Sequence, residues 1–188
     1  MIKIALFASG SGTNVENIYQ QFKGRNDLKV AMVVCNNPEA YVCSRARNLR
    51  IPLTLVSQRS LADGHSLLHI LQQEGIQFIA LAGFLKLVPS EIIEAYRGRI
   101  INLHPALLPK FGGKGMYGNK VHEAVLAAGE KESGITIHQV NEAYDEGSIV
   151  AQFRCPVYPI DTVESLAHRV HSLEYEHYPR TIAELALG

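Results

Sequence analysis

The sequence lacks net charge, long hydrophobic runs and a basic leader, and each absence narrows what the protein can be. Its 188 residues include 18 Lys and Arg against 18 Asp and Glu. A protein balanced in this way exerts no general attraction on nucleic acid or on an anionic membrane, so an anionic ligand must be held by a local site. No apolar run approaches the roughly 20 residues that a membrane-spanning helix needs. We therefore expect small-molecule ligands and neither nucleic acid nor membrane as partners.

Cysteine is also scarce. Cys35, Cys43 and Cys155 are odd in number and widely spaced, which favours reduced, buried thiols over a disulfide framework or a zinc site. The chain opens directly on a strand-like pattern, with no cleavable leader. These features predict a cytoplasmic protein. The sequence leaves the choice between a monomer and a homodimer open.

Apolar segments of strand length alternate with segments of helical periodicity. The predicted strands cover residues 2–8, 28–35, 52–56, 76–82, 100–103, 135–140 and 149–157. Asn37 and Pro38 predict the start of one helix, and Asp161 with Glu164 predicts a capping box that opens the last long helix. The pattern predicts an α/β fold. It is a Rossmann-like, mostly parallel central sheet of about seven strands, with helices on both faces and a mixed or antiparallel edge.

Ligands of such sheets bind beyond the carboxyl ends of the strands. The segments that follow predicted strands are residues 9–14, 36–37, 83–88, 102–104 and 141–147. We expect the chemistry of the protein to lie in these five segments.

The first of these segments resembles a dinucleotide-binding turn only in part. Gly10 and Gly12 lie where the first two glycines of G-x-G-x-x-G would, but Val15 replaces the third. No acidic residue follows the second strand to bind a ribose hydroxyl, and no Gly-Lys-Ser/Thr follows the loop, so both NAD and a P-loop are disfavoured. Backbone N–H groups of Ser11, Gly12 and Thr13 at a helix start predict a site for one phosphate. A tight turn that merely starts a helix remains the alternative.

The stretch INLHPALLPKFGG, residues 101–113, places two polar side chains at a strand end. Asn102 and His104 are two residues apart, so their side chains project to the same side, and Pro105 favours an extended His104. Asn supplies a hydrogen-bond donor for an oxyanion, and His moves protons near neutral pH. Asp145, in a later loop, is a candidate carboxylate partner for His104. Ordinary loop hydrogen bonding for the pair, and a plain turn for Asp145, are the alternatives.

Other catalytic classes lack support in the sequence. His65 with His69, and His168 with His171, have helical spacing, but neither pair has a third ligand, so we expect no metal. No serine nucleophile elbow and no activated cysteine is visible, which disfavours covalent catalysis.

At this point the sequence resembles the folate-dependent formyltransferases, whose signature is Asn-x-His-Pro-Ser/Ala-Leu-Leu-Pro with a downstream Asp. The resemblance runs from SGSGTN (9–14) through LAGFLKLVP (81–89) and INLHPALLPKFGG to YDEGSIVAQ (144–152) and EYEHYP (174–179). It is strongest to the branch that formylates the amine of 5-phosphoribosylglycinamide (GAR) in de novo purine (IMP) biosynthesis. The resemblance implies direct transfer from 10-formyltetrahydrofolate, a co-substrate, through a tetrahedral intermediate and without a metal.

The resemblance also assigns roles to residues. It implies that Asn102, His104 and Asp145 are catalytic. It implies GAR binding by Ser11, Gly12, Thr13, Asn14, Gly83, His171 and Glu174. It implies folate binding by Leu81, Phe84, Leu85, Lys86, Leu87, Val88, Asn141, Glu142, Ala143 and Tyr144. The single domain, residues 1–188, would divide into a nucleotide- and phosphate-binding half (1–100) and a catalytic and folate-contacting half (101–188).

Some alternatives stay open. Many relatives have a shorter Pro-Gly loop where this chain has residues 111–121, which form either an edge of the active site or a solvent loop. A related 10-formyltetrahydrofolate-dependent enzyme acting on a nucleotide-linked amino sugar is the main alternative function. A nicotinamide-dependent oxidoreductase and a non-enzymatic nucleotide-binding module are weaker ones. Siblings that formylate methionyl-tRNA or hydrolyse formyltetrahydrofolate are disfavoured, since we expect the chain to lack their additional domains.

Overall fold

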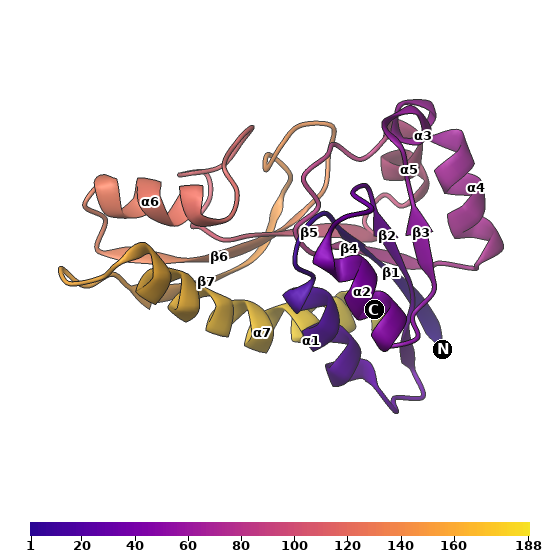
Figure 1. The fold of residues 1–188 in the computed structure, drawn as a ribbon, viewed down its shortest axis with the longest axis horizontal. Coiled ribbons are helices and arrows are strands. Elements are labelled where there is room, and N and C mark those ends of the chain that lie inside the picture. The colour runs from indigo at the N-terminus through magenta and orange to yellow at the C-terminus, as the bar shows by residue number, and fades with distance from the viewer.

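The computed structural model describes all of residues 1–188 and contains one seven-stranded sheet (Figure 1). The strands are β1 (Ile2–Ala8), β2 (Leu28–Cys35), β3 (Leu53–Leu55), β4 (Phe78–Leu81), β5 (Ile100–His104), β6 (Glu132–Gln139) and β7 (Ile149–Pro156). The helices are α1 (Thr13–Phe22), α2 (Tyr41–Asn48), α3 (Gln58–Asp63), α4 (His65–Gln73), α5 (Ser90–Ala95), α6 (Asn119–Ala127) and α7 (Val163–Leu187). Each of the seven predicted strands therefore has a counterpart in the sheet.

The sheet has the predicted mixed character. Its strand order is β3-β2-β1-β4-β5-β6-β7, and the pairs from β3 to β5 are parallel. β6 runs antiparallel to β5, and β7 runs antiparallel to β6. The order in which strands are added to the sheet reverses between β1 and β4, and ligands of doubly wound folds bind at such a switch point. The predicted Rossmann-like class is confirmed.

Two hydrophobic cores cover the two faces of the sheet. Along β1, Ile4 and Leu6 belong to one core and Ala5 and Phe7 to the other, because successive strand residues point to opposite faces. The first core contains side chains of α1, α2, α6 and α7, whereas the second contains side chains of α4 and α5. Helices therefore lie on both faces, as predicted.

The structure corrects both predicted helix starts. α2 begins at Tyr41, because Asn37 turns the chain first: its side chain accepts a hydrogen bond from Glu39 N and its carbonyl accepts one from Ala40 N. The capping box of α7 is formed by Thr162 and Ser165 rather than by acidic residues. The predicted cap Asp161 instead forms an ion pair with Arg169, which donates two hydrogen bonds to its carboxylate.

The long helix α7 runs along the sheet and anchors the strands that lead to the pocket (Figure 1). Tyr178 on this helix is fully buried, and its hydroxyl donates a hydrogen bond to Leu81 O of β4 at 2.8 Å and approaches Ile101 O of β5 at 3.4 Å. No helix of the chain has both the length and the apolar character needed to cross a membrane.

Candidate active site

A pocket of about 570 Å³ lies where β1, β4 and β5 end. All the predicted site residues line it except Glu142. The side chain of Glu142 is exposed, since it lies at the outside of a turn closed by a hydrogen bond from Ala143 N to Asn141 Oδ1. The fold thus brings together segments that are separated by up to 160 positions in the sequence.

The loop after β1 is held so that its carbonyl groups point away from the pocket. Gly10 O accepts a hydrogen bond from Val42 N at 3.1 Å, and Ser11 O accepts one from Arg45 Nε at 2.9 Å, both from α2. Gly12, with φ of 77°, precedes α1, and a Cβ at this position would meet Val42 Cγ2 at 2.5 Å. Glycine is therefore required at this position by both conformation and close packing.

No side chain caps the start of α1. The first backbone N–H groups of a helix have no partner within the helix, and its N-terminus carries a partial positive charge. Ser11, Gly12, Thr13 and Asn14 all line the pocket at this point. This arrangement is suited to an anion such as a phosphate.

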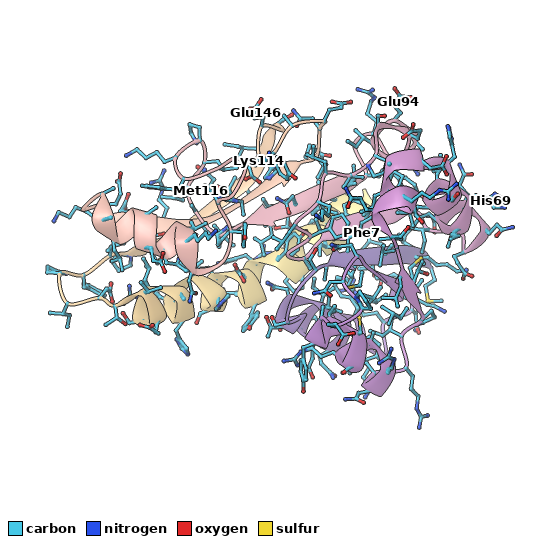
Figure 2. The ribbon with its side chains drawn as sticks, turned by 45° about the horizontal axis from the view of Figure 1, so that its top comes forward. Phe7, His69, Glu94, Lys114, Met116 and Glu146 are labelled. Atoms are coloured by element: carbon cyan, nitrogen blue, oxygen red, sulfur yellow. The ribbon has the colours of Figure 1, made fainter.

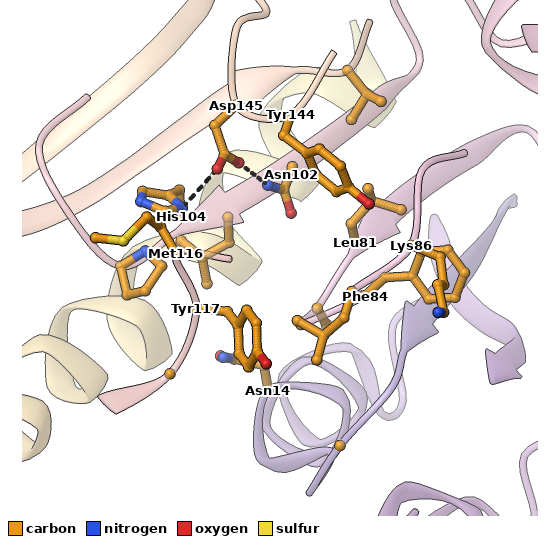
Figure 3. Close-up of a pocket in the computed structure, with 18 of the residues that line it drawn as sticks. Asn14, Leu81, Phe84, Lys86, Asn102, His104, Met116, Tyr117, Tyr144 and Asp145 are labelled. Carbon is orange, nitrogen blue, oxygen red and sulfur yellow. Dashed lines mark hydrogen bonds and ion pairs between the residues drawn. The ribbon is translucent and has the colours of Figure 1, made fainter. Parts of the chain in front are cut away.

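Asp145 is the centre of a hydrogen-bond network at the other end of the pocket (Figure 3). Its Oδ1 accepts a hydrogen bond from Asn102 Nδ2 at 3.2 Å, and its Oδ2 lies 3.4 Å from His104 Nδ1. Gly113 N also donates to Oδ2, at 3.0 Å. Asp145 has φ of 58°, an uncommon conformation for a residue with a side chain, and these three contacts hold it there.

His138 is a member of this network that the sequence reasoning did not assign to the site. Its Nδ1 lies 2.8 Å from Gln139 O, which requires an N–H on Nδ1, so Nε2 accepts a hydrogen bond from Asn102 Nδ2 at 3.1 Å. The Asn102 amide nitrogen thus directs its two hydrogens at His138 and Asp145. This corrects the expectation that Asn102 donates to an oxyanion, because only its Oδ1, an acceptor, is left for a ligand. His138 pairs directly with Asn102 across β5 and β6, a relation that is set by the strand register and is not visible in the sequence.

Both ring nitrogens of His104 face oxygen atoms. Nε2 lies 2.8 Å from Phe111 O and donates to it, which leaves Nδ1 directed at Asp145. Burial lowers the pKa of His104 by more than the Asp145 charge and the Phe111 carbonyl raise it. The ring is 3% exposed, so its second proton is stabilised only when negative charge lies close by.

Asp145 remains ionised in these surroundings. Burial is the largest single influence and raises its pKa, but the groups around the carboxylate, among them the charge of His104 and the Gly113 N–H, together outweigh burial and hold the pKa below its usual range. The result is a carboxylate and an imidazole that face one another in a largely dry part of the pocket. Such a pair can hold a proton on His104 or pass one on.

A second polar cluster lies next to the α1 start. Glu174 of α7 is 4% exposed, and its Oε2 accepts hydrogen bonds from Asn14 Nδ2 at 2.8 Å and from His171 Nδ1 at 2.9 Å. Neither bond uses Glu174 Oε1. The hydrogen bond that His171 donates to Glu174 raises the pKa of His171, against the smaller effect of burial. His171 is therefore a cation over a wider pH range than a free histidine.

The pocket wall formed by the end of β4 and the segment after it, residues 81–88, is largely apolar. Leu81, Phe84 and Val88 are mostly buried, and Phe84 packs edge-on against Phe7 with ring centroids 5.3 Å apart. The hydroxyl of Ser9 accepts a hydrogen bond from Leu85 N at 2.9 Å, which ties this wall to the loop after β1. An aromatic or heterocyclic group fits such a surface.

Residues 113–119 line the opposite rim of the pocket. Gly113 and Gly115 have φ of 93° and 89°, and Tyr117 is 43% exposed. Because Gly113 N also binds Asp145, this segment forms an edge of the site, which was one of its two predicted roles.

The two histidine pairs of helical spacing do not form metal centres. No group of three or more His, Cys, Asp or Glu side chains in the chain has the geometry to hold a metal ion. His65 and His69 are exposed on α4, and Figure 2 shows His69 at the periphery, far from Lys114 and Met116 of the pocket rim.

Comparison with known proteins places these features in a family context. Residues 2–182 match the family described as formyl transferase. The chain is 42% identical over 189 residues to the chloroplastic phosphoribosylglycinamide formyltransferase of Arabidopsis thaliana, covering 97% of this chain and 65% of that protein. It is 38% identical over 190 residues to phosphoribosylglycinamide formyltransferase of Bacillus subtilis, covering 98% and 95%.

Comparison with solved structures finds relatives that bear the same kind of name. Glycinamide ribonucleotide transformylase 1 from Geobacillus kaustophilus superposes with a TM-score of 0.88 at 36% identity, over 100% of both chains. The lengths of the relatives differ: the chain spans 65% of the Arabidopsis thaliana protein and 60% of its Vigna unguiculata counterpart.

Proposed function

The chain belongs to the formyl transferase family, and we propose that it transfers the formyl group of 10-formyltetrahydrofolate to the amine of GAR, giving formyl-GAR and tetrahydrofolate, in de novo purine biosynthesis. One observation carries the proposal. A single pocket contains an uncapped helix start at one end and the linked side chains of Asn102, His104 and Asp145 at the other. The names of the Bacillus subtilis and Geobacillus kaustophilus relatives support the choice of GAR.

The phosphate of GAR would bind at the start of α1. The loop carbonyls of Gly10 and Ser11 are tied to α2, so the N–H groups that follow are the polar backbone atoms available to an anion. A protonated His171 adds a charge-assisted donor, because its Nε2 is not used by Glu174. One phosphate suffices for this site, which fits the absence of a third glycine at Val15.

The ribose of GAR would lie against Glu174. Both protein hydrogen bonds to this carboxylate go to Oε2, so Oε1 can accept from ribose hydroxyl groups. A buried carboxylate with one free oxygen is a strong acceptor, since hydrogen bonds to a charged group are about twice as strong as neutral ones. This contact would orient the glycinamide arm toward Asp145.

The transfer step uses the three linked side chains. The amine lone pair of GAR attacks the formyl carbon, and the C=O electron pair moves onto oxygen. We assign the Nδ1–H of a protonated His104 to that oxyanion, because Asp145 holds it only loosely at 3.4 Å. The free Oδ1 of Asn102 accepts an N–H of the attacking amine, since both hydrogens of its Nδ2 are used by His138 and Asp145.

Asp145 would accept the proton that the attacking amine loses. The attacking amine loses a proton, which Asp145 accepts directly or through water, and the folate N10 gains a proton as the C–N10 bond breaks. The electron pair of the oxyanion then restores the formyl C=O on GAR. Protonation of His104 is favoured at the oxyanion stage, because negative charge beside the ring offsets the burial that lowers its pKa.

The apolar wall fits the folate. Leu81, Phe84 and Val88 offer a surface for the pterin, and the turn at Asn141 and Tyr144 offers backbone groups for its polar edge. 10-Formyltetrahydrofolate is a co-substrate that supplies the formyl carbon, and no step requires a metal ion. We also propose that residues 1–100 form the phosphate-binding half and residues 101–188 the catalytic and folate-contacting half, except that Leu81, Phe84 and Val88 contribute to the folate surface and His171 and Glu174 to the GAR site.

Three cysteines that are all buried and unpaired support a reducing, cytoplasmic location for this reaction.

The proposal is tested by formyl transfer from 10-formyltetrahydrofolate to competing amines. We expect turnover with GAR and none with a nucleotide-linked amino sugar at equal concentration. Transfer only to the amino sugar would replace GAR as the substrate, and transfer to neither would remove the proposed activity.

A further inference from the structure

His122 is a buried pocket residue that the proposed reaction leaves without a role. It lies in the first turn of α6, its side chain is only 1% exposed, and it lines the pocket. His171 and Glu174 of α7 and His104 of β5 all exert an electrostatic influence on it. The ring therefore lines the same pocket as the residues that we assign to the ribose, to the phosphate and to catalysis.

The Nδ1 atom of His122 is buried and has no hydrogen-bond partner. Burying a polar atom in this way destabilises a fold, so an unpaired atom of this kind needs an explanation. Four buried side-chain atoms of the chain lack a partner, and two of them, His122 Nδ1 and Asn14 Oδ1, belong to residues that line this pocket. Asn14 donates a hydrogen bond to Glu174 through its Nδ2, and the charge of Glu174 also acts on His122.

Packing alone does not account for a histidine at this position. Val121 and Val125 on the same helix are buried and apolar, and a leucine at position 122 would fill the space without an unpaired nitrogen. Histidine is favoured over leucine only where something hydrogen-bonds to the ring. The protein supplies no partner for Nδ1, which leaves a ligand of the pocket.

We propose that His122 is a substrate-recognition residue that hydrogen-bonds the ribosyl-amide portion of the ribonucleotide substrate, an inference that rests on the proposed function. Burial, followed by the charge of His171, lowers the pKa of His122, so the ring is neutral near pH 7 and offers one N–H donor and one acceptor nitrogen. Nε2 also has no hydrogen bond to the protein and is not fully shielded as Nδ1 is, so a ribose hydroxyl or the glycinamide amide can pair with it directly, whereas pairing with Nδ1 requires the ring to turn.

The test compares His122→Leu and His122→Gln with the wild-type chain. For each protein the melting temperature is measured without ligand, and the dissociation constants of GAR and of 10-formyltetrahydrofolate are measured by calorimetry. Glu123→Gln is the matched control, because Glu123 is the exposed neighbour on the same helix and does not line the pocket.

We expect His122→Leu to keep or raise the melting temperature, because it removes the unpaired nitrogen, and to weaken GAR binding about tenfold. Folate binding stays unchanged, and His122→Gln recovers part of the GAR affinity through its amide. Measuring the affinity of ribose 5-phosphate for both proteins shows which part of GAR the His122 ring contacts. If its affinity falls in His122→Leu, the ring binds the ribose, and if only GAR affinity falls, the ring binds the amide.

Unchanged GAR affinity in a folded His122→Leu variant would overturn the inference. So would a fall in melting temperature with equal losses of GAR and folate binding, since that result describes a structural residue. A wild-type chain that does not bind GAR would instead overturn the proposed function, so the two failures are distinct.

Discussion

The Asn14 side chain donates a hydrogen bond to Glu174 Oε2 at 2.8 Å and so joins the start of α1 to the middle of α7 across 160 positions of sequence. This bond places the anion-binding backbone beside the buried carboxylate and fixes which oxygen of Glu174 stays free. α7 is itself anchored to β4 by the hydrogen bond from Tyr178 to Leu81 O.

Asp145→Asn should abolish most turnover while leaving binding intact. The amide keeps the size of the side chain but carries no charge to hold a proton on His104 and accepts no proton from the amine. We expect kcat to fall on the order of 10²–10⁴-fold with little change in the dissociation constants of GAR and folate. Glu146→Gln, an exposed neighbour in the same loop, is the control and should retain wild-type rates. Near-normal turnover in Asp145→Asn would remove this residue from the mechanism.

GAR binding should weaken at high pH through His171. The hydrogen bond that His171 donates to Glu174 raises the pKa of His171, so the cationic ring is fully present at low pH and is lost as pH rises through this raised pKa. We expect the dissociation constant of GAR to increase roughly 3–10-fold across that range, a modest effect because the ring is half exposed.

His171→Lys is the matched variant for this pH dependence. Lysine stays charged to a much higher pH, so the His171-dependent rise in the dissociation constant should disappear, while titration of the phosphate itself affects both proteins equally. Identical pH profiles for the two proteins would show that His171 does not contact the phosphate.

Gly12→Ala should destabilise the chain and weaken GAR binding. A Cβ at position 12 meets Val42, and the left-handed backbone at this position is strained for alanine. We expect a loss of roughly 1–3 kcal/mol in the free energy of unfolding. Gly10→Ala, whose Cβ would meet no atom within 4 Å, should keep the wild-type free energy of unfolding. Equal denaturation midpoints for the two variants would contradict the packing role of Gly12.

Tyr178→Phe should lower the free energy of unfolding, because it removes the hydroxyl that donates to the backbone carbonyl of Leu81. The hydroxyl is fully buried and donates to Leu81 O at 2.8 Å, so its removal should cost about 1–2 kcal/mol in urea unfolding. Tyr175→Phe on the same helix is the control, since no hydrogen bond of its hydroxyl to the protein is present. A Tyr178→Phe variant as stable as this control would show that the buried bond adds nothing.

The sequence predicted the sheet and most of the pocket because both depend on local patterns. Continuous apolar strands and polar residues at their carboxyl ends are visible without three-dimensional information. The sequence misplaces the start of β6. Gly134 interrupts the apolar pattern, so the predicted strand begins at residue 135, whereas the observed strand begins at Glu132. In the structure the missing Cβ of Gly134 is what lets the Phe153 carbonyl of β7 come close, so the strand extends back to Glu132.

The remaining site features depend on cross-strand and interhelical contacts. The strand-end rule selected the loop of Asp145, but β6 is antiparallel, and its end at Gln139 lies beside Ile101 rather than His104. The loop reaches the site because Asn102, His104 and Gly113 all contact Asp145. His138 and His122 were not assigned because their partners, or the lack of one, follow from tertiary packing.

The most direct test of the account is a single-turnover reaction of the chain with GAR and 10-formyltetrahydrofolate labelled with ¹³C in the formyl group, followed by NMR. We predict that the label appears on the GAR amine as tetrahydrofolate forms, without an intermediate signal from formate or from a formylated protein. Release of the label as formate, or its appearance on the protein before it reaches GAR, would contradict direct transfer at Asn102, His104 and Asp145.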